Sequence, residues 1–184
     1  MRPTEDGQSF LLLLDAIDVF ESERIPYAVI GAVAASFYGV VRASLGADAI
    51  FSLAADSLES LEGVFQKRGF RTSLRRGTAD DPISAVLELT DSFGNRVDLL
   101  AGIRGQDPDL FSRAVETKFH SHSLRMVGLE DFIAMKLYAG SYQDLADARS
   151  AVEISGHALD RNLLQRLTAR FGKESVNHLK EILP

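Results

Sequence analysis

The beginning of the chain carries apolar residues at the spacing of one helical face. Between Ser9 and Phe20 they recur at intervals of three and four residues, which is typical of an amphipathic helix. Pro26 closes this segment, and the short apolar run from Tyr27 to Ile30 then predicts a strand. Gly31 and the small residues after it predict a helix that packs tightly against a sheet.

The middle of the chain alternates between apolar runs and turn residues, which predicts a small sheet. The stretch 47–53 is apolar except for Asp48 and Ser52, as expected of a strand that is buried on most of its surface. Further strands are predicted at 70–74, 83–89, 96–100 and 121–127. Helices are predicted at about 57–68, where Asp56 or Ser57 can act as the cap, and from Pro108.

From Leu129 onward the pattern is helical, with breaks near Gly140, Gly156 and Gly172. We therefore predict an α/β (α+β) fold with a small mixed sheet flanked by helices. Residues 1–128 would form the core, and residues 129–184 a C-terminal helical segment packed on it.

Composition narrows the classes of protein that fit. The chain has 184 residues, of which 46% are hydrophobic and 25% charged, so disordered and fibrous classes are excluded. A formal net charge of -6 disfavours a broad nucleic-acid-binding face. Disulfides and thiolate metal sites are excluded because there is no cysteine. No signal peptide or membrane-spanning run is visible, which makes a cytoplasmic protein the expectation.

The most informative stretch runs from Val29 to Phe51 and reads VIGAVAASFYGVVRASLGADAIF. A strand, a glycine turn and a small-residue helix lead to an acidic residue on a second strand. This arrangement resembles the nucleotidyltransferase superfamily and, within it, the AbiEii-like group of bacterial abortive-infection proteins. The positions that fall where the group's pattern puts them, without a gap, are Gly31, Ala34, Gly39, Arg42, Ser44 and Asp48.

Two positions depart from that pattern. Gly46 stands where the group has the first aspartate of an Asp-x-Asp pair, and Ala32 replaces the second of two paired glycines. The group's third carboxylate, on a neighbouring strand, is matched by Asp98.

The resemblance extends into the predicted helical segment. Lys136, Asp144 and Asp147 match a lysine followed by a Lys/Arg-Asp-x-x-Asp element, in which Gln143 replaces the basic residue. The likeness therefore covers most of the chain between about Tyr27 and Val152.

The resemblance implies a site for two Mg²⁺ ions at which a nucleotide is transferred from a nucleoside triphosphate to a hydroxyl group. Asp48 and Asp98 would be the catalytic metal ligands. Gly31, Arg42, Ser44 and Lys136 would contact the nucleotide. Gly46 supplies no carboxylate, so we expect weak metal occupancy and transfer slowed by roughly two orders of magnitude or more. The alternative is a pseudoenzyme, a non-catalytic binding or assembly module that retains the fold.

A substitute metal ligand is suggested by the hairpin around Phe93. If the hairpin turns symmetrically, Glu88 lies opposite Asp98 with both side chains on one face. Two like charges there would repel each other unless a cation or an arginine lay between them. A shift of one residue in register would break this pairing.

Each site residue also has a structural interpretation. Asp98 could be the polar face of a hairpin strand, and Arg42 and Ser44 could simply end a loop. Lys136 could be a solvated helical lysine. Asp144 and Asp147 could provide a helix cap and an ion pair with Arg149 or Arg161.

The expected partners follow from the resemblance. They are a nucleoside triphosphate, an RNA or protein acceptor, and a cognate antitoxin, because the group includes toxins that modify RNA. An acidic protein would need a local basic patch to hold RNA, and the only visible cluster is Arg71, Arg75 and Arg76.

Overall fold

A mixed sheet forms the centre of the molecule. The computed structural model describes residues 1–40, 45–119 and 122–183. The strands are β1 (Tyr27–Ile30), β2 (Gly46–Phe51), β3 (Arg71–Arg76), β4 (Ile83–Thr90), β5 (Arg96–Ile103), β6 (Val115–Phe119) and β7 (His122–Met126). They form a seven-stranded sheet in the order β3-β4-β5-β2-β1-β7-β6. The β2–β5 and β1–β7 pairs are parallel and the others are antiparallel.

Helices cover both faces of the sheet. The α-helices are α1 (Ser9–Glu23), α2 (Gly31–Phe37), α3 (Leu58–Lys67), α4 (Leu129–Ala139), α5 (Tyr142–Ser155), α6 (Arg161–Arg170) and α7 (Lys173–Ile182). Short 3-10 turns are η1 (Ala55–Ser57), η2 (Pro108–Phe111) and η3 (Gly156–Ala158). The predicted α/β class with a mixed sheet is confirmed.

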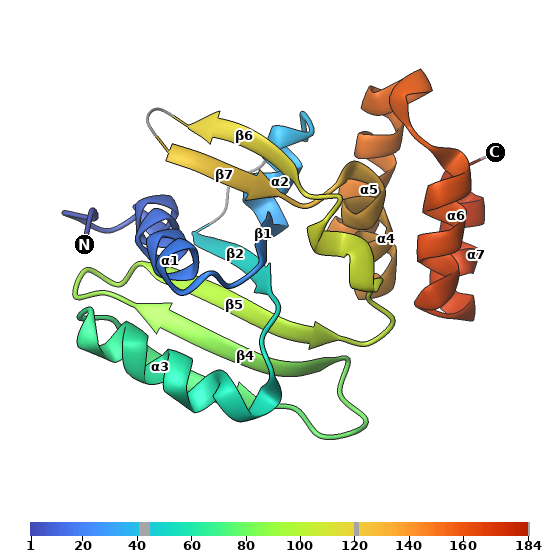
Figure 1. The fold of residues 1–184 in the computed structure, drawn as a ribbon. Coiled ribbons are helices and arrows are strands. Elements are labelled where there is room, and N and C mark those ends of the chain that lie inside the picture. Colours follow the sequence, from blue (N-terminus) through green and yellow to red (C-terminus); the bar gives the residue numbers. More distant parts are fainter. Residues whose placement is uncertain (41–44, 120–121, 184) are drawn as a thin grey trace.

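One face of the sheet is covered by α1 and α3 (Figure 1). Their apolar stripes pack against alternate residues of the central strands, such as Ala47, Ala49 and Phe51 of β2. Phe20 of α1 stacks on Phe51, with ring centroids 5.4 Å apart. This alternation sends Asp48 and Ile50 to the opposite face.

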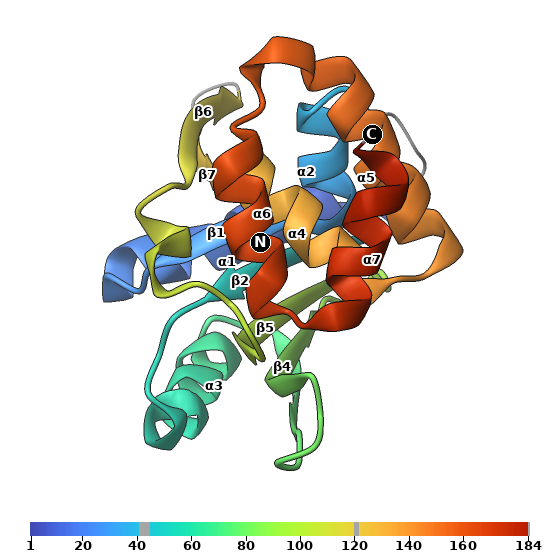
Figure 2. The same cartoon turned by 90° about the vertical axis from the view of Figure 1, so that its right-hand side faces the viewer.

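The opposite face is covered by the C-terminal helices, which Figure 2 shows in front of the sheet. Ala28 and Ile50 share an apolar cluster with Phe132, Ile133 and Leu137 of α4. Helix α4 in turn contacts α5, α6 and α7. The helical segment therefore buries the β1–β2 part of this face.

Glycine residues correctly predicted the ends of the C-terminal helices. Gly140, which adopts a left-handed φ of 67°, directly follows α4. The other two predicted breaks coincide with the ends of α5 and α6. None of the helices in the described residues combines the length and apolar character needed to cross a bilayer.

The short helix predicted from near Pro108 is present as the 3-10 turn η2. Two other local features differ from what the sequence suggested. Ser57 occupies the cap position of α3, but its side chain makes no capping hydrogen bond and instead donates to Asp56. Strand β6 was not predicted, because its sequence VETKF is mostly solvent-exposed and carries no alternating apolar signal.

Candidate functional site

Three carboxylates form a row across neighbouring strands. Glu88 of β4 pairs in register with Asp98 of β5, and Asp98 pairs with Asp48 of β2. Adjacent strands lie about 4.8 Å apart, so the three Cα atoms follow one another across the sheet. The symmetric hairpin register predicted for Glu88 is therefore confirmed. Residues far apart in the sequence meet on the face that also carries the C-terminal helices.

Gly31 lies at the β1 end of this row. Its neighbour Ile30 is the Cα partner of Asp48, and Gly31 itself has a left-handed φ of 64°. A Cβ atom on Gly31 would collide with the carboxylate of Asp48. Glycine is required here both by the backbone conformation and by the close approach of Asp48.

Gly46 lies two residues before Asp48, on the same face of β2. Its Cα partner is Arg96 of β5. A Cβ at Gly46 would meet only the Arg96 carbonyl oxygen, at 3.8 Å, so a side chain would fit. A Cβ atom therefore fits at the position where the resemblance expects a carboxylate, but Gly46 provides none.

Arg96 brings a positive charge into the carboxylate row. Its Nη2 lies 2.5 Å from Asp98 Oδ2, and its Nε donates to Asp98 Oδ1 at 3.1 Å. The same Nε lies 3.3 Å from Glu88 Oε2. The hydrogen bond to Asp98 and the charge of Asp98 raise the pKa of Arg96 above its ordinary value, with smaller contributions from Glu88 and Asp48.

The donor set does not fit the two Mg²⁺ ions that the resemblance implies. Two such ions bring four positive charges and require oxygen ligands. Asp98 and Glu88 already bind the Arg96 guanidinium, and Gly46 adds no oxygen. Within the described residues, no group of three or more His, Asp or Glu side chains is arranged to hold a metal ion.

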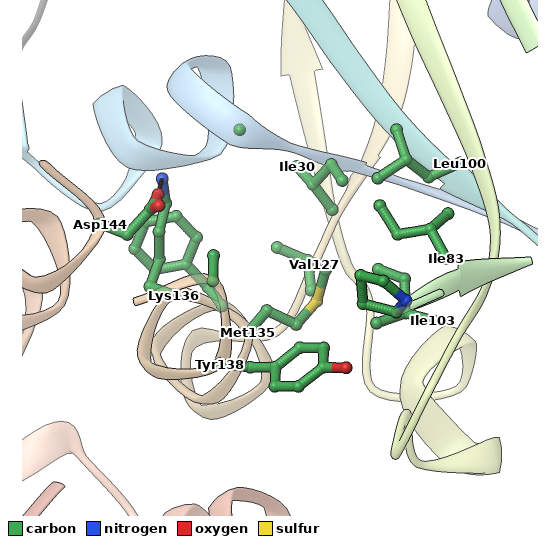
Figure 3. A pocket seen from close by; sticks show the side chains of 13 residues that line it. Ile30, Ile83, Leu100, Ile103, Val127, Met135, Lys136, Tyr138 and Asp144 are labelled. Atoms are coloured by element: carbon green, nitrogen blue, oxygen red, sulfur yellow. Dashed lines mark hydrogen bonds and ion pairs between the residues drawn. The ribbon is translucent and has the colours of Figure 1, made fainter. Parts of the chain in front are cut away.

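A largely apolar pocket of about 440 Å³ adjoins the carboxylate row. Ile30 and Leu100, on the sheet, face Met135 of α4, while Lys136 and Asp144 lie together at one end (Figure 3). Leu100 is two residues beyond Asp98 on the same strand face. The pocket therefore continues the surface that presents the carboxylates.

Solved structures of nucleotidyltransferases share this arrangement of strands and helices. Neither a protein-family model nor a curated protein sequence matches the chain. ANT(2″)-Ia in complex with adenylyl-2″-tobramycin is 16% identical, with a TM-score of 0.61, covering 88% of this chain and 95% of that one. A putative nucleotidyltransferase from Thermotoga maritima is 16% identical, with a TM-score of 0.58 and coverages of 83% and 97%. The lincosamide antibiotic adenylyltransferase LnuA, lincomycin-bound, is 12% identical, with a TM-score of 0.51 and coverages of 83% and 99%.

The chain has a nucleotidyltransferase fold. Identities this low establish the fold and leave the activity open, since one fold supports many functions. The fold implied by the Val29–Phe51 pattern is thus confirmed, whereas membership of the superfamily stays a prediction. The AbiEii-like group stays a prediction.

Lys136 is a buried residue that forms two ion pairs. The interpretation of Lys136 as a solvated helical lysine was therefore wrong. Its Nζ lies 2.7 Å from Asp144 Oδ1 and 2.9 Å from Asp147 Oδ2. The lysine is nearly buried and Asp147 is fully buried. Among the interactions described, Asp144 and Asp147 pair with Lys136 rather than with Arg149 or Arg161. Two carboxylates thus already share the three donors of the Lys136 ammonium group.

The remaining sequence-predicted site residues divide into two sets. Arg42 and Ser44 lie outside the described residues, so their contact with a nucleotide stays a prediction. In the arginine cluster, Arg75 approaches Glu88 at 3.9 Å on the carboxylate face. Arg76 is one residue further along the strand and pairs with Glu59 of α3 on the other face.

Arg96 is the site residue that sequence analysis did not single out. The signal was present, since two opposed carboxylates require a cation and Arg96 lies two residues from Asp98 on the same strand. The sequence does not show that the Arg96 side chain extends toward Glu88.

Proposed function

We propose that this protein binds a nucleoside triphosphate beside Asp48 and is strongly impaired in transferring the nucleotide to a hydroxyl acceptor. The observation that carries the proposal is the carboxylate row, which keeps Asp48 and Asp98 in adjacent register but has Gly46 beside them. We expect transfer to be slower by about two orders of magnitude than with a complete site, by analogy with the loss of other electrostatic stabilisers.

Nucleotidyl transfer joins the acceptor oxygen to the α-phosphorus, and the bond from that phosphorus to the bridging oxygen breaks so that pyrophosphate leaves. The hydroxyl proton must pass to a base. We assign the proton to Asp48 because of its position, since its carboxylate lies against Gly31, which lines the pocket. Mg²⁺ would supply charge stabilisation in a complete site, and Asp48, Asp98 and Glu88 are the candidate ligands, but Arg96 opposes it here.

The acceptor is a second part of the proposal. The resemblance to AbiEii-like proteins favours an RNA or protein acceptor and a cognate antitoxin as partner. The apolar pocket favours a small hydroxyl-bearing molecule, consistent with the adenylyl-tobramycin of ANT(2″)-Ia and the lincomycin of LnuA. We favour a small acceptor, because the pocket adjoins the carboxylate row. RNA would need a basic patch, and only Arg71 and Arg75 of the arginine cluster lie on the face of the sheet that carries the carboxylate row.

The first test is calorimetry with each nucleoside triphosphate, with and without Mg²⁺. We expect the native protein to bind one of them and Asp48→Ala to bind it about tenfold or more weakly, because a bound group beside Asp48 loses a partner. Asp56→Ala, which removes an exposed carboxylate outside the row, is the matched control and should bind normally. Absence of binding to the native protein would contradict the proposal.

The second test restores the missing carboxylate. Gly46→Asp should raise pyrophosphate release by about two orders of magnitude, since a Cβ atom fits at this position and the aspartate adds the missing carboxylate beside Asp48 and Arg96. Gly46→Asn, of the same shape without the charge, is the control and should stay slow. A native protein that already turns over as fast as Gly46→Asp would show that the site is not impaired.

A non-catalytic binding module is the second candidate, and the Arg96 contacts favour it. A protein that evolved only to bind could keep the carboxylates paired internally. In that case nucleotide binding would persist in native protein and in Gly46→Asp, while neither would release pyrophosphate.

A further inference from the structure

The carboxylate row contains its own cation. Arg96 forms two hydrogen bonds with Asp98 through Nε and Nη2, a bidentate geometry that suits a guanidinium and a carboxylate. Its Nε also lies 3.3 Å from Glu88. One side chain thus contacts two of the three carboxylates.

The position of this cation follows from the sheet register. Glu88 and Asp98 are Cα partners on antiparallel strands, where two like charges destabilise the pair. Arg96 precedes Asp98 by two residues and shares its face, so its long side chain reaches along the strand to both carboxylates. No distant segment is needed to supply the charge.

Gly46 completes the arrangement. It is the Cα partner of Arg96 on the neighbouring strand and presents no side chain to the guanidinium. An aspartate at position 46 would offer Arg96 a third carboxylate and draw it from Asp98 and Glu88. The absence of a carboxylate at position 46 and the presence of Arg96 therefore act together on the charge of the carboxylate row.

We infer that the Arg96 guanidinium takes the place of a divalent cation in this site, so that the carboxylate row is assembled without a metal. Asp98 and Glu88 are neutralised by a covalently attached charge that cannot diffuse away. A divalent ion can enter only by displacing the guanidinium, and the native protein therefore binds such ions weakly. This inference goes beyond nucleotidyl transfer, because a protein that transfers nothing would keep the same ion pairs.

The experiment compares native protein, Arg96→Gln and Arg96→Lys by Mn²⁺ calorimetry and by thermal unfolding in EDTA and in excess Mn²⁺. The native Tm should not respond to Mn²⁺. Arg96→Gln should have a lower Tm in EDTA, regain about 2–4 °C when Mn²⁺ is added, and bind Mn²⁺ roughly tenfold or more tightly than native protein. Arg96→Lys keeps the charge and should show no response to Mn²⁺.

Two controls separate this effect from general loss of charge. Arg75→Gln removes a more exposed arginine that is 3.9 Å from Glu88, and it should gain no Mn²⁺ affinity. If Arg96→Gln does not fold, Arg96→Gln combined with Glu88→Gln should fold, because the opposed charges are then gone.

Either of two results would overturn the inference. One is native protein that binds Mn²⁺ as tightly as Arg96→Gln. The other is a double variant that remains unfolded, which would show that Arg96 acts through packing. Neither result depends on nucleotide binding or on pyrophosphate release, so the test stands apart from that of the proposed function.

Discussion

Single residues at the site are constrained by how closely the strands bring them together. Gly31 is the clearest case, because its left-handed φ of 64° and the carboxylate of Asp48 both exclude a Cβ atom. Gly31 is therefore a backbone requirement, whereas its contact with a nucleotide stays a prediction. A glycine that fits an aspartate this closely fixes where that aspartate can lie.

We predict that Gly31→Ala lowers the free energy of unfolding by about 2–4 kcal/mol, from about 1–2 kcal/mol of left-handed strain and the rest from displacing Asp48. Gly94→Ala is the matched control, since Gly94 has a φ of 90° and no atom near its Cβ position, so it reports strain alone. Urea unfolding measures both. Adding Asp48→Ala to Gly31→Ala should recover part of the loss, and equal losses for Gly31→Ala and Gly94→Ala would contradict the predicted collision.

Elements are joined at the site by buried ion pairs as well as by packing. Lys136 of α4 binds Asp144 and Asp147 of α5 and fixes these two helices against each other at the end of the pocket. Burial acts to raise the pKa of Asp144, but hydrogen bonds from Lys136 and Ser141 outweigh it and the pKa is lowered from its usual value. The lowered pKa means that the charged form of Asp144 stabilises the folded state.

We predict that Lys136→Met lowers the free energy of unfolding at neutral pH by about 3 kcal/mol, because buried Asp147 loses a cation 2.9 Å from its carboxylate. The folded-state pKa of Asp144 lies below its unfolded value of about 3.9, so its contribution is present at neutral pH and is lost as the pH falls through that region. The difference between native protein and Lys136→Met should therefore shrink on acidification. Lys180→Met, on the exposed face of α7, is the control in urea titrations at several pH values. A difference that stays constant with pH would contradict the predicted linkage.

The whole molecule is a sheet whose two faces are covered by helices from opposite ends of the chain. Phe20 of α1 packs on one face and Leu137 of α4 on the other, and both are fully buried. The strands between them contribute alternate residues to both apolar clusters. This shared sheet couples the predicted core, residues 1–128, to the predicted helical segment, residues 129–184.

We predict that Phe20→Ala and Leu137→Ala each lower the same single unfolding transition, by about 3–5 and about 2–5 kcal/mol respectively. Phe93→Ala is the control, because Phe93 is 46% exposed and its loss should change the free energy by less than about 0.5 kcal/mol. Calorimetric and spectroscopic unfolding curves provide the measurement. Two separate transitions, each sensitive to one variant, would show that the helical segment unfolds independently.

The sequence by itself determined the features that depend on near neighbours. Apolar periodicity located α1 and most strands, glycines marked the ends of the C-terminal helices, and the Val29–Phe51 pattern pointed to the superfamily whose fold the chain has. The exposed strand β6 was not predicted, because an edge strand with few apolar residues leaves no periodic signal in the sequence.

Only the tertiary structure decided which charges meet. The Glu88 to Asp98 register was predicted conditionally, but it depended on long-range pairing that a shift of one residue would have changed. The burial of Lys136 and the contact of Arg96 with both carboxylates depend on side-chain paths through space, for which sequence spacing gives no rule. The absence of a carboxylate at Gly46 can be read from the sequence. The contact of Arg96 with Glu88 and Asp98 is seen only when strands β4 and β5 lie side by side.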